Sequence, residues 1–281
     1  MEKPYSLGLY EKALPPELSW KEKMEVAKRC HFDFLEISID ETDEKLARLD
    51  MSQGERSLLA NTVLVMGFPI GSMCLSGHRK YPLGSRDPAT EKRSLQIMAK
   101  AIALAGDLGI RIIQLAGYDV YYEESDEQTR KRFMQNLQIC VSWAAKQGVI
   151  LAFETMETPF LNTVGKAMAV VRQIDSPYLQ IYPDLGNITN AVRSIGGTVL
   201  SDLQSGKGHI AGMHLKETVE GQFRNLLFGE GGVDFPSGIR EAWELGVRRY
   251  VTEFWYQGNP EWEADVLFAH DFVSAYLDKE C

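Results

Sequence analysis

Short runs of consecutive apolar residues recur along this chain, and they constrain its fold more than any other feature of the sequence. Each run is four to six residues long and is bounded by polar residues or glycine. Parallel strands that are buried on both faces have this pattern, whereas half-exposed strands alternate apolar and polar residues. The predicted strands are residues 6–9, 34–39, 70–75, 112–116, 150–153, 179–182, 210–215 and 250–254.

The segments between these runs have helical spacing. Residues 88–108 and 127–147 repeat apolar side chains every three or four positions. Asp87 is suited to cap the first of these helices and Pro88 to occupy its first turn. Four glycines that precede predicted strands are suited to end helices, because glycine adopts the left-handed conformation at little steric cost. These glycines are Gly67, Gly109, Gly148 and Gly246.

Strands and helices therefore alternate through the whole chain. Eight strands in 281 residues correspond to about 35 residues per strand–helix unit, which suits a closed barrel. No linker or shift in composition divides the sequence, so we predict one catalytic domain, a single (β/α)8 TIM barrel over residues 1–281. An open doubly wound sheet is the alternative. It would be expected to carry a glycine-rich phosphate loop after its first strand, and residues 8–12 lack one.

The composition narrows the cellular setting. Acidic residues outnumber basic ones by 39 to 30, and a formal charge of −9 disfavours nucleic-acid partners. No stretch approaches the roughly 18 apolar residues that a membrane helix needs, and the N-terminal residues lack the pattern of a secretory signal. The four cysteines form no CxxC pair, as is typical of a reducing compartment. We therefore expect a cytoplasmic protein without nucleic-acid or membrane partners.

Side chains of metal-ligand type stand at the ends of four consecutive predicted strands, separated by 30, 30 and 39 residues. The carboxyl ends of barrel strands meet at one face, so these side chains can converge. Three carboxylates and an imidazole suit one divalent ion, Zn²⁺, Mn²⁺, Mg²⁺ or Co²⁺, and leave room for a substrate to complete the coordination. The four candidates are Glu154, Asp184, His214 and Glu253.

This ligand set resembles that of the xylose-isomerase-like barrels, which include sugar epimerases, isomerases and endonuclease IV. Longer motifs resemble the L-ribulose-5-phosphate 3-epimerases over almost the whole chain. That family is also called the L-xylulose-5-phosphate 3-epimerases and, in older usage, the hexulose-6-phosphate isomerases. The motifs that carry the resemblance are residues 8–15, 38–44, 73–79, 114–122 and 228–231.

The resemblance implies an isomerase that inverts C3 of a ketopentose phosphate, L-ribulose 5-phosphate to or from L-xylulose 5-phosphate, in bacterial breakdown of L-ascorbate. A divalent ion would polarise the C2 carbonyl and stabilise an enediolate, while two carboxylates on opposite sides of the sugar transfer the proton. Glu154 and Glu253 are the predicted acid–base pair as well as metal ligands, and Asp184 and His214 mainly hold the ion. A homo-oligomer, a dimer or larger, is also implied.

Substrate contacts are predicted from polar residues close to the strand ends. Asn187 stands where ketohexose 3-epimerases of the same superfamily carry a histidine, which disfavours a free ketohexose as substrate. His78 and Lys216 are the candidate phosphate contacts, and Lys216 shares a strand face with His214, two residues away. Further candidates for substrate contact are Glu157, Gln114 and Arg224.

Other polar residues near the same strand ends have different expected roles. Glu36, like Glu157 and Gln114, is a candidate either to contact a sugar hydroxyl or to orient His214 from behind. The basic residues after His78, namely Arg79, Lys80 and Arg86, belong to the same cationic cluster that could face the phosphate, but we expect them to be solvated, as long basic side chains on loops usually are.

Three alternative functions share parts of this evidence. An aldose–ketose isomerase of a sugar phosphate would use the same metal and carboxylates, with proton transfer between C1 and C2. A nuclease of the endonuclease IV type would need a three-metal cluster and a basic DNA groove, which five histidines and a charge of −9 disfavour. A non-catalytic sugar-binding barrel would have no need of two opposed glutamates.

Overall fold

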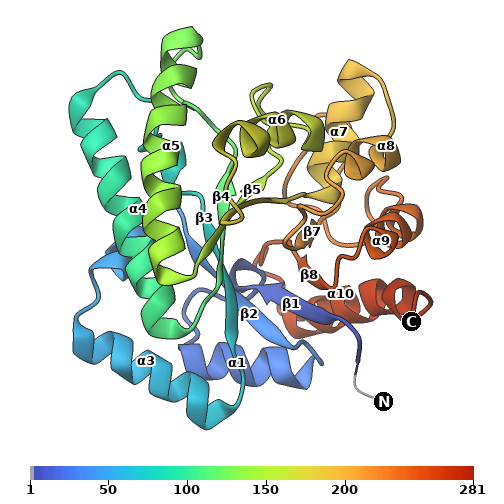
Figure 1. The fold of residues 1–281 in the computed structure, drawn as a ribbon. Helices are drawn as coiled ribbons and strands as arrows, with labels where there is room; N and C mark the ends of the chain where they lie inside the picture. The colour runs from blue at the N-terminus through green and yellow to red at the C-terminus, as the bar shows by residue number, and fades with distance from the viewer. Residues whose placement is uncertain (1–2) are drawn as a thin grey trace.

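The computed structural model describes residues 3–281, and its strands and helices alternate along the chain. Eight parallel strands form one central sheet, and the helices surround it (Figure 1). The predicted bounds are confirmed for β2, β3, β4 and β6. The strands are β1 Ser6–Tyr10, β2 Phe34–Ile39, β3 Ile70–Leu75, β4 Ile112–Ala116, β5 Ile150–Glu154, β6 Leu179–Tyr182, β7 Met213–Leu215 and β8 Arg249–Thr252.

The two helices that the sequence predicts with bounds, 88–108 and 127–147, are confirmed, whereas Gly246, predicted to end a helix, lies one residue beyond the C-cap Leu245. The Asp87 carboxylate accepts the N–H groups of Ala89 and Thr90, with Pro88 in the first turn. Gly67, Gly109 and Gly148 end three helices with positive φ angles of 56°, 75° and 65°. The helices are α1 Trp20–Arg29, α2 Asp43–Ala47, α3 Gln53–Met66, α4 Pro88–Leu108, α5 Glu127–Gln147, α6 Val164–Ile174, α7 Leu185–Ile195, α8 Val199–Gln204, α9 Phe235–Glu244 and α10 Trp262–Leu277.

The barrel closes between β6 and β7. Parallel ladders join all other neighbours, in the order β6-β5-β4-β3-β2-β1-β8-β7, with one shift of register in the β2–β3 ladder between Leu35 and Glu36. The closing contact consists of two isolated parallel bridges, Ile181–Ile210 and Asp184–His214. The chain takes one residue more from 210 to 214 than from 181 to 184, so the ladder is interrupted as at a bulge. The predicted start of the seventh strand at residue 210 is therefore wrong, since β7 begins at Met213.

The barrel strands are almost completely buried. Every residue of β2 and β4 is buried, as expected for parallel strands between a filled barrel interior and an outer layer of helices. Helix α4 turns Met98, Ile102 and Leu108 toward this core. Among residues 3–281, no helix is both long enough and apolar enough to cross a lipid bilayer. The fold is the predicted single (β/α)8 barrel.

Candidate functional site

Four buried side chains meet at the carboxyl ends of β5 to β8, as the sequence predicts. Glu154 is the last residue of β5, Asp184 follows β6, His214 lies in β7 and Glu253 follows β8. One potential ligand atom from each lies within 4.8 Å of those of the other three. None of the four side chains is more than 6% exposed. We call these four residues the ligand cluster.

The backbone register brings two members of this cluster together. Asp184 and His214 are partners in the bridge that closes the barrel, and the His214 N–H donates to the Pro183 carbonyl at 2.9 Å. Asp184 is also the N-cap of α7, where its Oδ1 accepts the Asn187 N–H at 2.6 Å. Its other oxygen, Oδ2, is therefore left to face the cluster.

A second layer of side chains orients the imidazole of His214. The Nε2 of His214 lies 2.6 Å from Glu36 Oε1, and Glu36 Oε2 accepts the Ser72 hydroxyl at 2.6 Å. A carboxylate only accepts hydrogen bonds, so Nε2 is the protonated nitrogen. This leaves Nδ1 facing Glu253 Oε2 at 3.3 Å and Glu154 Oε1 at 3.7 Å. Such a carboxylate–histidine arrangement is typical behind metal ligands.

The cluster has more negative than positive charge. Burial and the carboxylate of Glu253 raise the pKa of Glu154, and burial together with the same neighbour raises the pKa of Asp184 well above its ordinary value. The ammonium of Lys216 lies 3.1 Å from Asp184 Oδ2 and 3.3 Å from Glu253 Oε2. Burial would raise the pKa of Glu253, but Lys216 and His214 together lower it well below its ordinary range. A further cation would relieve the remaining repulsion.

The residues present fit a divalent ion. Asp184 Oδ2, His214 Nδ1 and Glu253 Oε2 are buried and have no aligned hydrogen-bond partner among the described residues. Buried polar atoms normally make hydrogen bonds, so three ligand atoms at one point without an aligned hydrogen bond indicate a missing ligand. Oxygen and imidazole donors suit Mn²⁺, Mg²⁺, Zn²⁺ or Co²⁺. Residues 3–281 contain no second group of three or more such side chains that could hold an ion.

A cavity of ≈ 170 Å³ lies against the ligand cluster, and it suits a small molecule. Glu154 and Glu253 line it together with the predicted substrate contacts Asn187, Lys216, Glu157 and Arg224. The Asn187 amide donates to the Thr155 carbonyl at 2.7 Å, while the side-chain oxygen has no hydrogen-bond partner within residues 3–281.

Two other predicted substrate contacts lie differently from expectation. Gln114 is buried outside the cavity lining, and its amide donates to Glu154 Oε2, so its observed contact is to the glutamate. Lys216 lines the cavity, but its ammonium is held between Asp184 and Glu253. The structure therefore places Lys216 beside the ligand cluster and gives no support to a phosphate contact there.

The structure corrects the prediction for the loop after β3. His78 does not line the cavity, because its ring is buried and its Nε2 lies 3.1 Å from the Ser94 carbonyl of α4. Burial lowers the pKa of His78 to about 4, so the ring is neutral and poorly suited to a phosphate. Its neighbour Arg79, which we expected to be solvated, lines the cavity with a side chain that is 13% exposed.

Sequence reasoning missed several other lining residues, among them Lys12, Asp40 and Trp255. Lys12 and Asp40 form an ion pair, and Trp255 packs edge-on against Tyr10. Asp40 and Trp255 come directly after the predicted strands 34–39 and 250–254. Their position at strand ends is the signal that could have identified them, since this is where barrel active sites are built.

Comparisons with known proteins agree with this architecture. The family model described as "Xylose isomerase-like TIM barrel" matches residues 24–271. A protein of Escherichia coli (strain ATCC 8739) named L-ribulose-5-phosphate 3-epimerase UlaE is 43% identical over 280 residues, which are 99% of this chain and 97% of that protein. A protein of the same name from Shigella sonnei is also 43% identical, with the same coverage of both chains.

Solved structures match over nearly the whole chain. A structure of L-ribulose 3-epimerase has a TM-score of 0.81 at 17% identity and covers 98% of this chain and 95% of its own. D-Psicose 3-epimerase from Clostridium cellulolyticum H10, solved with D-tagatose, has a TM-score of 0.80 at 15% identity, with 97% and 99% covered. At such low identity these similarities establish the fold.

Proposed function

This chain belongs to the xylose isomerase-like TIM barrel family, and from that premise we propose that it is a metal-dependent sugar-phosphate 3-epimerase. The proposed reaction interconverts L-ribulose 5-phosphate and L-xylulose 5-phosphate, and the first of these is named by relatives that match 99% of the chain. The observation that carries the proposal is the ligand cluster itself, in which two glutamates from β5 and β8 meet at the end of a cavity of small-molecule size.

The ligand cluster would hold one divalent ion through Glu154, Asp184, His214 and Glu253. When bound, such an ion supplies Lewis-acid stabilisation of the negative charge that develops on the ketose oxygens. Glu36 fixes the histidine ring for this task, and the α7 cap fixes the carboxylate of Asp184. Lys216 offsets negative charge beside Asp184 and Glu253.

Inversion at C3 needs one group to remove the proton and another to return a proton to the opposite face. Glu154 and Glu253 come from β5 and β8, with β6 and β7 between them around the barrel, so they can flank a bound sugar. Gln114 donates to Glu154 Oε2 and the Asn187 amide donates to Oε1 at 3.5 Å, and these contacts orient the carboxylate. The two carboxylates exchange acid and base roles when the reaction runs in reverse.

Asn187 is the proposed contact for a sugar hydroxyl. Asn187 lines the cavity, and its side-chain oxygen is buried without a hydrogen-bond partner among the described residues. An amide oxygen can accept a hydrogen bond from a hydroxyl group. The predicted homo-oligomer remains a prediction, as does the cytoplasmic location, with which four free cysteine thiols agree.

The test is exchange of the C3 proton with solvent. Metal-loaded protein is incubated with L-ribulose 5-phosphate in D₂O, and NMR locates deuterium in both ketoses. We expect deuterium at C3 in the wild type, and a loss of exchange of about 100- to 10,000-fold in Glu154→Gln and in Glu253→Gln. Metal content is measured in each variant, because both residues are also proposed ligands.

Glu220→Gln is the matched control, since Glu220 is an exposed glutamate outside the cavity, and it should exchange at the wild-type rate. Wild-type exchange in both glutamate variants with metal bound would refute the proposed acid–base pair. Formation of an aldose labelled at C2 would show an aldose–ketose isomerase.

A further inference from the structure

Helix α3 exposes large apolar side chains on its outer side. Leu58, Leu64 and Val65 are 68%, 77% and 76% exposed, which places them among the most exposed large apolar residues of the described chain. The helix lies at an outer edge of the molecule and packs against α1 and α4 (Figure 1). Its inner side contributes Leu59 and Val63 to the core. A helix that is apolar on both sides is normally buried on both, so the outer side of α3 lacks a partner.

The exposed outer side carries no charge. Arg56 donates to Asp107 at 2.8 Å and to two backbone carbonyls, and Glu55 accepts the N–H and hydroxyl of the N-cap Ser52 at 2.7 Å. No other residue of α3 is charged, whereas α5 exposes four charged side chains. We call the remaining exposed residues the α3 face; they are Gly54, Ser57, Leu58, Asn61, Leu64 and Val65.

The α3 face is self-complementary. Gly54, Leu58, Asn61 and Val65 follow the alternating spacing of four and three residues that is typical of a helix–helix contact. Leu58 and Val65 stand on either side of Asn61, three and four residues away. In an antiparallel pair with a two-fold axis near Asn61, Leu58 of one copy would contact Val65 of the other. The two Asn61 amides would face each other, and each can both donate and accept a hydrogen bond.

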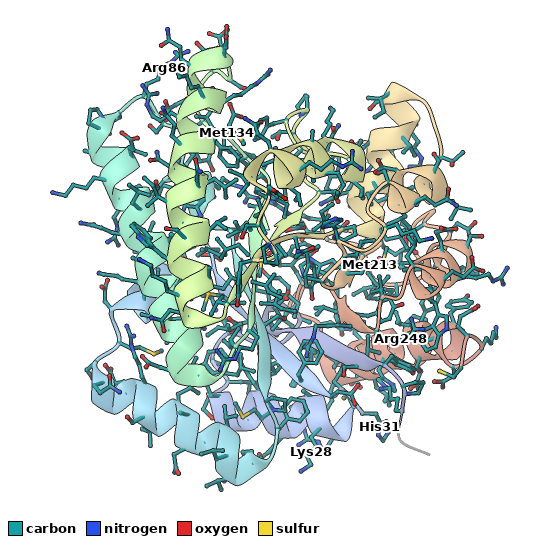
Figure 2. The ribbon with its side chains drawn as sticks, in the orientation of Figure 1. Lys28, His31, Arg86, Met134, Met213 and Arg248 are labelled. Atoms are coloured by element: carbon teal, nitrogen blue, oxygen red, sulfur yellow. The ribbon has the colours of Figure 1, made fainter. Side chains whose placement is uncertain are left out.

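The two ends of α3 have complementary charges. Glu55 lies in the first turn, and Lys28 of α1 donates to the Met66 carbonyl at the last residue of the helix, at 3.4 Å. Lys28 lies at the lower edge of the molecule (Figure 2). Glu55 and Met66 are six and five residues from Asn61, so the antiparallel arrangement brings Glu55 of each copy alongside Lys28 of the other. The two helix dipoles also oppose each other in this arrangement.

The size of the α3 face sets the expected strength. From Gly54 to Val65 it is about 16 Å long at 1.5 Å per residue. One pair of helices of this length buries less than the roughly 800 Å² per partner of a standard interface. We therefore expect a reversible association with a Kd of about 1 to 100 µM.

We propose that the α3 face is the interface of a reversible homodimer, in which two copies of this chain pair their α3 helices antiparallel about a two-fold axis at Asn61. A face without charge fits its own copy, because a protein with a formal charge of −9 meets no like charge there. A lipid surface would instead favour basic residues around the apolar ones, and the one basic residue of α3, Arg56, is paired with Asp107.

The test is sedimentation velocity from about 1 to 200 µM protein. The wild type should change from monomer to dimer over this range. Val65→Glu should weaken the dimer at least about 10-fold, because it places a charge in the apolar contact twice, once from each copy. Leu58→Ala should weaken it about 10-fold for the same reason of symmetry. Lys28→Glu faces Glu55 of the other copy and should weaken the dimer about 3-fold, with the difference lost at high salt.

Ile139→Glu is the matched control, since Ile139 is an apolar residue of α5 that is 42% exposed. It should dimerise like the wild type, and circular dichroism should show all variants to be folded. A wild type that stays monomeric at about 200 µM would overturn the proposal, and binding of that monomer to anionic vesicles would assign the α3 face to a lipid surface. A dimer that Val65→Glu leaves unchanged would place the interface elsewhere and overturn it as well.

Cross-linking tests the two-fold axis directly. Helix axes 8 to 10 Å apart place facing Cα atoms about 4 to 5 Å apart, close enough for a disulfide. Asn61→Cys should therefore form a covalent dimer on mild oxidation, in a Cys281→Ser background that removes the exposed native thiol. Ile139→Cys in the same background should remain monomeric on a non-reducing gel. Equal yields of covalent dimer from the two variants would refute the antiparallel pairing.

Discussion

Two buried charge clusters lie at the strand ends of this barrel, and they differ in the balance of charge. In the first, which we call the Glu11 cluster, one carboxylate contacts three cations. Lys23 Nζ lies 2.9 Å and Lys45 Nζ 3.5 Å from Glu11 Oε2, and Arg48 donates to both oxygens of the same group. The ligand cluster has the opposite balance, with three carboxylates beside His214 and Lys216.

The hydrogen bonds differ in the same way. Both oxygens of Glu11 have partners, including the Ser38 N–H at 2.7 Å. In the ligand cluster, Asp184 Oδ2, His214 Nδ1 and Glu253 Oε2 have no aligned partner among the described residues. A cluster whose acceptors are all occupied connects chain segments, whereas one with unpaired acceptors at a common point is built for a ligand.

The pKa directions follow the balance of charge. Burial would raise the pKa of Glu11, but Arg48 and Lys23 lower it to about 2. Burial and the neighbouring carboxylates raise the pKa of Asp184 well above its ordinary value, despite Lys216. Glu11 is therefore stable as an anion in the folded protein alone, whereas Asp184 needs a further cation besides Lys216.

The largest effect is expected for Asp184→Asn. Losing an anionic ligand should reduce epimerase kcat/KM about 1,000- to 10,000-fold, about 4 to 5.5 kcal/mol of transition-state stabilisation. Asparagine caps helices nearly as well as aspartate, and one of the crowded charges is removed. Chemical denaturation of the metal-free protein should therefore show little change in the free energy of unfolding. A strong destabilisation would mean that the ligand cluster is structural.

Glu11→Gln should have the opposite effects to Asp184→Asn, lowering the stability of the protein and leaving catalysis unchanged. It leaves three cations around a neutral amide, so we expect the free energy of unfolding to fall by about 3 to 4 kcal/mol, measured by urea denaturation. Catalysis per folded molecule should be unchanged, because Glu11 does not line the catalytic cavity. Wild-type stability in this variant would contradict a structural role for the Glu11 cluster.

The pH dependence of the stability difference between wild type and Glu11→Gln is the control for this prediction. The carboxyl of Glu11 has a pKa of about 2 in the folded protein and an ordinary value of 4.5 when unfolded. Its ionised form therefore stabilises the protein fully above pH 4.5, and this contribution is lost as the pH falls toward 2. The stability difference between wild type and Glu11→Gln should narrow over that interval and stay constant near neutrality.

The smallest effect, a loss of metal affinity, is expected for a substitution of Glu36, which lies behind the ligand cluster. Glu36→Gln keeps a hydrogen bond to His214 Nε2 but removes the charge that orients and polarises the ring. We expect Mn²⁺ affinity to fall about 10- to 100-fold, by competition with a fluorescent chelator. Glu220→Gln, at the surface, should leave the affinity unchanged. Unchanged Mn²⁺ affinity in Glu36→Gln would show that Glu36 does not contribute to metal binding.

Part of the site could be predicted from the sequence, because the positions of these residues depend only on where strands end. Glu154 ends β5, and Asp184 and Glu253 lie directly beyond β6 and β8, so convergence follows once the strands form a barrel. The roles of His78 and Arg79 did not follow. A single 3₁₀ turn sends one side chain under α4 and its neighbour into the cavity, and residue type does not distinguish those directions.

The sequence by itself determined the barrel, since buried parallel strands require continuous apolar runs and helix ends require caps and glycines, both of which are local patterns. The sequence also determined which four side chains make up the ligand cluster, because the carboxyl ends of the strands lie on one face of the barrel. Only the tertiary structure decided the partners of the charged groups. Lys216 pairs with ligand carboxylates and Arg79 is left with free donors because loops from separate strands meet there, and electrostatic pairing depends on distances that no local pattern encodes.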